Sequence, residues 1–159
     1  MPRLNLGCEL DKRSKEEGWV NVDIRPECEP DLVHDLTKPL PYENNTVDEI
    51  LAKDILEHFS WRQVPDILKD WYRVLKPGAQ IYIQTPDLAT ISSHILSNVL
   101  WTWEQISYWI YGEQNVPENA HKSGFTISTL ARLLTEVGFK VKEMNKGGTN
   151  IMAYAYKPS

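Results

Sequence analysis

The sequence predicts an α/β protein with a mostly parallel sheet of seven strands that ends in an antiparallel strand. Short β-rich runs occur along the chain, a helical pattern separates the fourth run from the fifth, and a short glycine-containing loop joins the last two. Strands on either side of a crossover helix run parallel, whereas strands joined by a hairpin run antiparallel.

Seven runs with strand-like composition are bounded mostly by Gly, Pro, Asp or Asn. Their predicted ranges are Arg3–Leu6, Trp19–Ile24, Asp31–His34, Val47–Ala52, Gln80–Gln84, Phe139–Met144 and Asn150–Tyr156. The loop before the last run contains Gly147 and Gly148, which suit a hairpin turn.

Two helices are indicated by apolar residues at spacings of three and four. The first carries Trp61, Val64, Leu68, Trp71 and Leu75 and ends at Lys76-Pro77-Gly78. Ser60 and Gln63 resemble a capping box at its start, which places Pro65 early in the helix. The second helix is expected to begin at a Thr126 cap, with a Phe125–Leu130 staple, and to end at Gly138.

The chain of 159 residues is interpreted as a single domain, residues 1–159, because it shows no repeat, linker or low-complexity tract. Residues 87–124 stand apart as an aromatic-rich insertion or lid with a helical pattern. Its aromatic residues are expected to pack against the core in preference to binding a ligand, and burial in a dimer interface is the other alternative.

Composition excludes several classes of protein. The net charge is −5 with scattered lysines and arginines, which argues against a nucleic-acid partner. No apolar stretch is long enough to span a membrane and no secretory leader is visible, so a soluble, cytoplasmic protein with a small-molecule substrate is expected. With only Cys8 and Cys28, both predicted to be free thiols, no metal site is expected.

Three predicted strands end in residues that suit an adenosine ligand. Gly7 would let the backbone approach a ligand, and Asp23 can accept hydrogen bonds from both hydroxyls of a ribose. The third strand ends in His34-Asp35-Leu36, which offers an acceptor and an apolar contact to an adenine edge. Ligands in open α/β sheets bind at this edge.

The loop after Gly7 lacks both glycine-rich phosphate motifs, and Glu9 would repel a pyrophosphate. The same carboxylate can pair with the ammonium of S-adenosylmethionine. Three basic residues follow closely, Lys12, Arg13 and Lys15, so a ligand that contains phosphate remains an alternative.

The sequence resembles the class I S-adenosylmethionine-dependent methyltransferases, especially a group of short members. The matching stretches are Leu4-Asn5-Leu6-Gly7-Cys8, Gly18-Trp19-Val20-Asn21-Val22-Asp23, His34-Asp35-Leu36 with Pro39-Leu40-Pro41, Leu56-Glu57-His58, Arg73-Val74-Leu75-Lys76-Pro77-Gly78, and His121-Lys122-Ser123-Gly124-Phe125 ahead of a helix ending in Gly138-Phe139. The resemblance implies a Rossmann-like three-layer sandwich, S-adenosylmethionine as cofactor, and cofactor contacts from Gly7, Asp23, Asp35, Lys53 and Asp54.

The candidate cofactor-binding residues are Asn5, Gly7, Cys8, Glu9, Asp23, Ile24, Asp35, Leu36, Lys53 and Asp54. Two features depart from the family: Glu9 stands where a second glycine is usual, and the connection from Gly7 to Asp23 is too short for a full helix. The N-terminal helices of many relatives are also missing, which favours a homodimer that completes the pocket.

Methyl transfer to an oxygen needs positioning and a base. The candidate catalytic residues are His121, which we place first, and Asp54 and His58. Relatives suggest a saccharide hydroxyl as acceptor, on which Trp101 and Trp103 would stack. The alternatives are a noncatalytic protein that binds S-adenosylmethionine or S-adenosylhomocysteine in a degenerate site, and, ranked last, a nicotinamide-dependent oxidoreductase.

Overall fold

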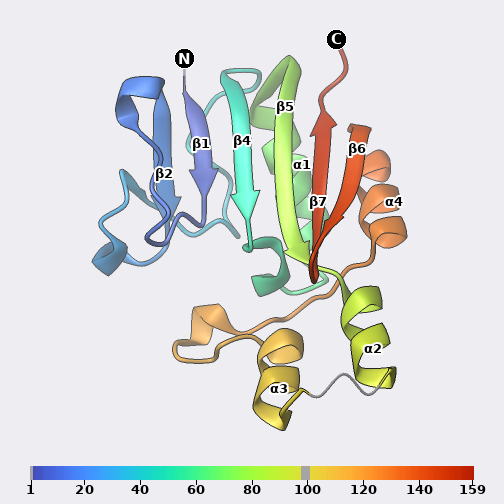
Figure 1. The fold of residues 1–159 in the computed structure, drawn as a ribbon. Helices are drawn as coiled ribbons and strands as arrows, with labels where there is room; N and C mark the ends of the chain where they lie inside the picture. Colours follow the sequence, from blue (N-terminus) through green and yellow to red (C-terminus); the bar gives the residue numbers. More distant parts are fainter. Residues whose placement is uncertain (1, 98–100) are drawn as a thin grey trace.

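A computed structural model describes residues 2–97 and 101–159, which fold around one seven-stranded sheet in the order β3-β2-β1-β4-β5-β7-β6 (Figure 1). The strands are β1 (Arg3–Leu6), β2 (Trp19–Asp23), β3 (Leu32–Val33), β4 (Val47–Lys53), β5 (Leu75–Pro86), β6 (Lys140–Gly147) and β7 (Asn150–Tyr156). Strands β1 to β5 pair in parallel, and β7 runs antiparallel to both β5 and β6. The predicted fold class and antiparallel last strand are confirmed.

Two helices cover one face of the sheet, α1 (Val64–Val74) and α4 (Ile127–Val137), and they contact each other there (Figure 1). The core lies between these helices and the sheet. Strand residues that face it alternate with residues that do not: Leu4 and Leu6 of β1 are fully buried, whereas Arg3, which faces the other side of the sheet, is partly exposed. This period of two is the normal alternation of a β-strand.

The opposite face of the sheet has no α-helix over it within residues 2–97 and 101–159 (Figure 1). The connection from β1 to β2 contains only the 3-10 turn η1 (Lys15–Glu17), and that from β2 to β3 only η2 (Pro26–Cys28). The second helical layer is therefore reduced to short turns and loops, as the short connection after Gly7 led us to expect.

The two helix starts show one correct and one incorrect prediction. Thr126 caps α4 by accepting from the Thr129 N–H, and Gly138 ends the helix with φ +117°. The capping box at Ser60 is wrong, because the Ser60 carbonyl accepts from the N–H groups of Gln63 and Val64 and closes a turn ahead of the helix. Helix α1 therefore begins at Val64, with Pro65 in its first turn as predicted.

The predicted insertion, residues 87–124, contains α2 (Leu88–Leu96), α3 (Trp103–Tyr111) and the 3-10 turn η4 (Pro117–Asn119). It lies beyond the carboxyl ends of β1, β4 and β5 (Figure 1). Residues 98–100 of this predicted insertion fall outside the described residues. Among the described residues, no helix is long and apolar enough to cross a membrane.

Candidate active site

Two adjoining cavities open at the carboxyl ends of β1, β2 and β4. The larger has a volume of about 350 Å³ and extends toward α3 and η4, and the smaller extends toward the loop after β3. Both are lined by Gly7, Asp23, Ile24, Ile55, His58 and Glu118. Strand order reverses at β1, which pairs with β2 on one side and β4 on the other, so the cavities occupy the usual ligand position of an open α/β sheet.

The loop after β1 depends on left-handed backbone at two positions. Gly7 has φ +65°, and a Cβ there would lie 2.6 Å from the side chain of Ile55. Glu9 has φ +44°, a conformation that favours glycine, which explains why a glycine is usual at this family position. The Glu9 side chain pairs with Arg25 at 3.0 Å, and both residues line the larger cavity.

Asp23 ends β2 and is nearly buried, with 5 % of its surface exposed. Its carboxylate accepts from the backbone N–H of Glu9 at 2.9 Å and from the backbone N–H of Arg25 at 3.0 Å. Asp23 thus joins the loops that follow β1 and β2 and also lines both cavities. It is both a ligand candidate and a structural link.

The smaller cavity contains the predicted residues Asp35 and Leu36. The hydroxyl and the backbone N–H of Thr37 both donate to Asp35 Oδ1. The hydrogen bond from the Thr37 side chain is the main reason that the pKa of Asp35 is lowered. A carboxylate that is ionised at neutral pH therefore lies beside the apolar Leu36, the pair of groups expected to contact an adenine.

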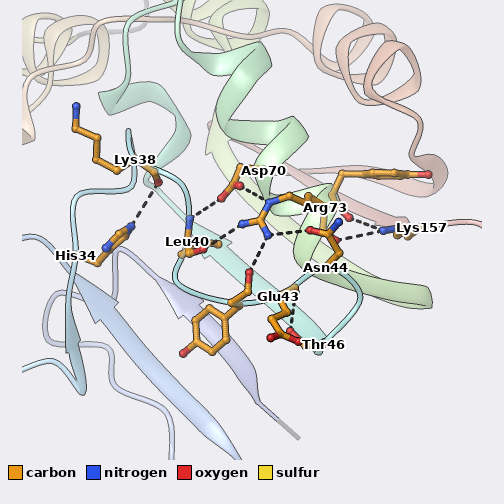
Figure 2. A network of polar contacts seen from close by, with 11 residues as sticks. His34, Lys38, Leu40, Glu43, Asn44, Thr46, Asp70, Arg73 and Lys157 are labelled. Carbon is orange, nitrogen blue, oxygen red and sulfur yellow. Dashed lines mark hydrogen bonds and ion pairs between the residues drawn. The ribbon is translucent and has the colours of Figure 1, made fainter.

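Arg73 of α1 holds the loop that carries Asp35, as Figure 2 shows. Its guanidinium donates to the Leu40 carbonyl at 3.0 Å, the Tyr42 carbonyl at 2.7 Å and Asp70 Oδ1 at 2.8 Å. The other Asp70 oxygen accepts from the Leu40 N–H at 2.7 Å. The two family-like stretches around Pro39-Leu40-Pro41 and Arg73 are therefore joined in space.

All three predicted catalytic residues line the larger cavity: Asp54, His58 and His121. The two imidazole rings lie edge to face with centroids 5.1 Å apart. Desolvation lowers the pKa of both histidines. Asp54 lies at the mouth, where surrounding protein reduces its hydration and raises its pKa, against a hydrogen bond from Gln84 at 2.8 Å.

Glu57 is a cavity residue that sequence reasoning did not single out, although it lies within the Leu56-Glu57-His58 stretch. Its side chain is 2 % exposed and accepts from the Thr85 hydroxyl at 2.9 Å. Burial raises the pKa of Glu57 to about 8. Its backbone carbonyl accepts from the N–H groups of Lys122 and Ser123, which brings the His121 segment to the 3-10 turn η3 (Leu56–His58).

Three predicted cofactor residues do not line either cavity. Asn5 is buried and donates to Asn21 and to the Asp11 carbonyl, and Cys8 is buried beneath its loop. Lys53 pairs with Asp11 at 2.7 Å on the open face of the sheet, because neighbouring strand residues point to opposite faces.

The aromatic residues at the larger cavity also differ from the expected pair. Trp103 is 74 % exposed, and the Trp101 ring packs on His94 and Trp109. Tyr108 and Trp109 line the cavity instead. The helical period of α3 decides which aromatic side chains face the cavity, and the sequence pattern alone did not fix that orientation.

A family model described as a methyltransferase domain matches residues 10–144. No curated protein matches the sequence significantly.

Solved structures share the fold at low sequence identity. A S-adenosylmethionine-dependent methyltransferase from Methanosarcina mazei has a TM-score of 0.70 at 20 % identity, covering 99 % of this chain and 92 % of that one. One from Archaeoglobus fulgidus has a TM-score of 0.71 at 19 % identity, covering 98 % and 86 %. One from Mesorhizobium loti has a TM-score of 0.72 at 14 % identity, covering 98 % and 90 %.

Proposed function

The chain belongs to the class I S-adenosylmethionine-dependent methyltransferases, and from this premise we propose that it methylates a hydroxyl of a small polar acceptor, with saccharides as the favoured class. The observation that carries the proposal is the convergence of Gly7, Asp23 and Asp35 from three strand ends on two adjoining cavities. The smaller cavity suits the adenosine part, and the larger suits the methionine part together with an acceptor.

The side chains around the larger cavity fit S-adenosylmethionine, which carries a sulfonium and an ammonium. Six carboxyl groups and one guanidinium line this cavity, from Glu9, Asp23, Asp54, Glu57, Glu113, Glu118 and Arg25. Burial raises the pKa of Glu57 to about 8, so the negative charge at neutral pH comes mainly from the other carboxyl groups. Such a lining attracts cations and opposes a pyrophosphate. It therefore favours the sulfonium cofactor over a dinucleotide.

When bound here, S-adenosylmethionine would supply an electrophilic methyl group for transfer to an acceptor oxygen, with S-adenosylhomocysteine as the leaving group. Asp23 would hold the ribose, and the loop at Gly7 would let the backbone approach the ligand. Asp54 stands at the cavity mouth, near His121, where an acceptor proton can be taken. The chain's own contribution is thus positioning and proton removal.

The acceptor class is supported by the lining of the larger cavity beyond the cofactor residues. Tyr108 and Trp109 provide flat apolar faces, and Asn119 and Asn150 provide amide groups beside them. Aromatic faces combined with amides suit a polar molecule that also has an apolar face, such as a sugar ring.

The test is calorimetric titration with S-adenosylmethionine and S-adenosylhomocysteine, followed by mass analysis of candidate glycans after incubation. We expect micromolar binding by the natural sequence, a loss of more than about tenfold in Asp23→Ala, and no change in Asp66→Asn, whose carboxylate pairs with Lys69 on the exposed side of α1. Circular dichroism checks that the Asp23 variant is folded. Methylation of another acceptor with no methylated sugar would refute the saccharide proposal.

A further inference from the structure

The larger cavity holds one group of side chains with the composition of a metal site. Glu57, His58 and His121 each present a ligand atom, and these atoms all lie within 4.8 Å of one another. Glu57 is buried and the two histidines are half-buried. Two imidazoles and one carboxylate form a common ligand set for zinc in sites that keep a fourth position open.

The hydrogen bond of His58 to the Ala120 carbonyl determines which ring nitrogen can face a metal ion. Its Nδ1 lies 3.3 Å from the Ala120 carbonyl, which can only accept, so Nδ1 carries the proton. Nε2 then keeps its lone pair. A metal-binding histidine usually donates its other N–H to a backbone carbonyl or carboxylate in this way.

His121 and Glu57 also have hydrogen-bond partners. Hydrogen bonding to the backbone of Trp109 and Ile110 raises the pKa of the His121 ring, against the larger lowering by burial. The Thr85 hydroxyl donates to one carboxylate oxygen of Glu57 at 2.9 Å, so the other oxygen is free of that bond. Each of the three side chains therefore has a supporting hydrogen bond that orients it.

The backbone also fixes the two segments that supply these side chains. Lys122 N–H donates to the Glu57 carbonyl at 2.8 Å, and His121 N–H donates to the Tyr111 carbonyl at 3.0 Å. A Cβ at Gly112 would lie 2.2 Å from the Asn119 carbonyl oxygen, so the end of α3 approaches this segment as closely as glycine allows. The cluster is thus built by packing of three chain segments.

We propose that Glu57, His58 and His121 bind a divalent metal ion of the zinc class, and that this ion holds the acceptor oxygen at its open position. Bonds of about 2.1 Å in a tetrahedral site place ligand atoms about 3.4 Å apart, so the present separations close by at most about 1.4 Å on binding, within the reach of side-chain rotation. The acidic lining of the cavity favours a cation. The role toward the acceptor rests on the proposed function, whereas metal binding itself does not.

The metal proposal changes the assignment of the base. With both imidazoles bound to the ion, two of the three predicted catalytic residues can no longer act as a base. Asp54 is the one that can still take a proton. His121, which the sequence placed first as base, becomes a ligand instead.

The experiment is titration of the chelator-treated, full-length protein with Co²⁺, followed by visible absorption and then by competition with Zn²⁺. We expect the protein to bind one equivalent of Co²⁺ and to show the visible d–d absorption of coordinated Co²⁺. Addition of Zn²⁺ should displace the Co²⁺ and abolish this absorption. Affinity should fall more than about 100-fold in Glu57→Gln and His121→Gln, because each loses a direct ligand. The matched control is His94→Gln, which removes a histidine outside the cluster and should bind Co²⁺ as the natural sequence does.

Thermal unfolding of every variant establishes that it is folded, and Thr85→Val adds a milder change, with an expected loss of about tenfold because Glu57 loses its orienting hydroxyl. Absence of stoichiometric Co²⁺ binding, or equal binding by folded cluster variants, would overturn the metal site. S-adenosylmethionine binding is measured on the same samples, so its failure would count against the proposed function alone.

Discussion

The reactivity of Cys8, which lies two residues after β1, is altered by its burial. Burial, with smaller contributions from the charges of Asp23 and Cys28, raises the pKa of its thiol to about 11. At pH 8 about one such thiol in a thousand is ionised, compared with about one in four for an unperturbed cysteine. Only the thiolate reacts with alkylating agents, so Cys8 should be nearly inert at neutral pH.

We therefore expect iodoacetamide to label Cys8 on the order of 100-fold more slowly at pH 8 than in the urea-unfolded chain. The rate should rise about tenfold for each pH unit up to about pH 10, since the raised pKa postpones ionisation. Mass spectrometry of the peptide that contains Cys8 gives the rate. Labelling as fast as in the unfolded chain would contradict the burial of this thiol.

The site residues show what sequence reasoning can and cannot locate. Asp23, Asp35 and Asp54 were found because parallel strands end at one edge of the sheet, which places the residues that follow them together. Glu57 was missed because a carboxyl side chain is rarely buried, and the residues next to it in the sequence do not indicate that Thr85 is its hydrogen-bond partner. Arg25 was missed because its role depends on the turn that aims it at Glu9.

Among the elements, the loop between β3 and β4 is held against α1 mainly through the side chain of Arg73. Arg73 of α1 donates to the Leu40 and Tyr42 carbonyls of this loop and pairs with Asp70 within the helix. A lysine has one ammonium in place of the planar fork and cannot reach these acceptors together. The carbonyls that would lose their donor are partly buried, so water would not fully replace the lost hydrogen bonds.

Arg73→Lys should lower the free energy of unfolding by about 1–3 kcal/mol, measured by urea denaturation. It should also weaken S-adenosylmethionine binding, because the same loop carries Asp35. The matched control is Arg132→Lys in α4, whose exposed pair with Glu136 at 3.7 Å is worth less than about 0.5 kcal/mol. Equal stability of the two variants would show that the Arg73 contacts do not hold the loop.

Element positions were predicted more accurately than element ends. All seven strands were located, but β5 runs from Leu75 to Pro86 where only Gln80–Gln84 was expected. Its first residue, Leu75, pairs with Val47 of β4, and the part from Gln80 to Pro86 pairs with β7. Such pairing joins residues that are far apart in the chain, so the sequence of the strand itself does not predict it. The helix cap at Thr126 was predictable because a cap is a local contact between residues three apart.

For the molecule as a whole, the main departure from a fully covered α/β sheet is its open face. Arg3, Glu49 and Trp19 meet there: Arg3 donates to Glu49 at 2.8 Å and lies over the Trp19 ring at 4.3 Å. The rings of Tyr82 and Tyr154 lie on the same face, with their centroids 4.8 Å apart. A parallel sheet that is covered on both faces has nearly continuous apolar strands. The alternation of polar and apolar residues in β1 therefore indicates that one face of the sheet is exposed to water.

Two neighbouring residues of β4 test this arrangement, because Ile50 points into the core and Leu51 points to the open face. Ile50→Ala should cost about 2–5 kcal/mol of unfolding free energy, since it leaves a cavity under α1 and α4. Leu51→Ala should cost only about 1 kcal/mol, because its side chain is half-buried and leaves no enclosed space. Urea denaturation of both variants at the same protein concentration gives the comparison. Equal losses, together with a sedimentation coefficient that rises with concentration, would instead place a second copy of the chain over the open face and so favour the homodimer expected from the sequence.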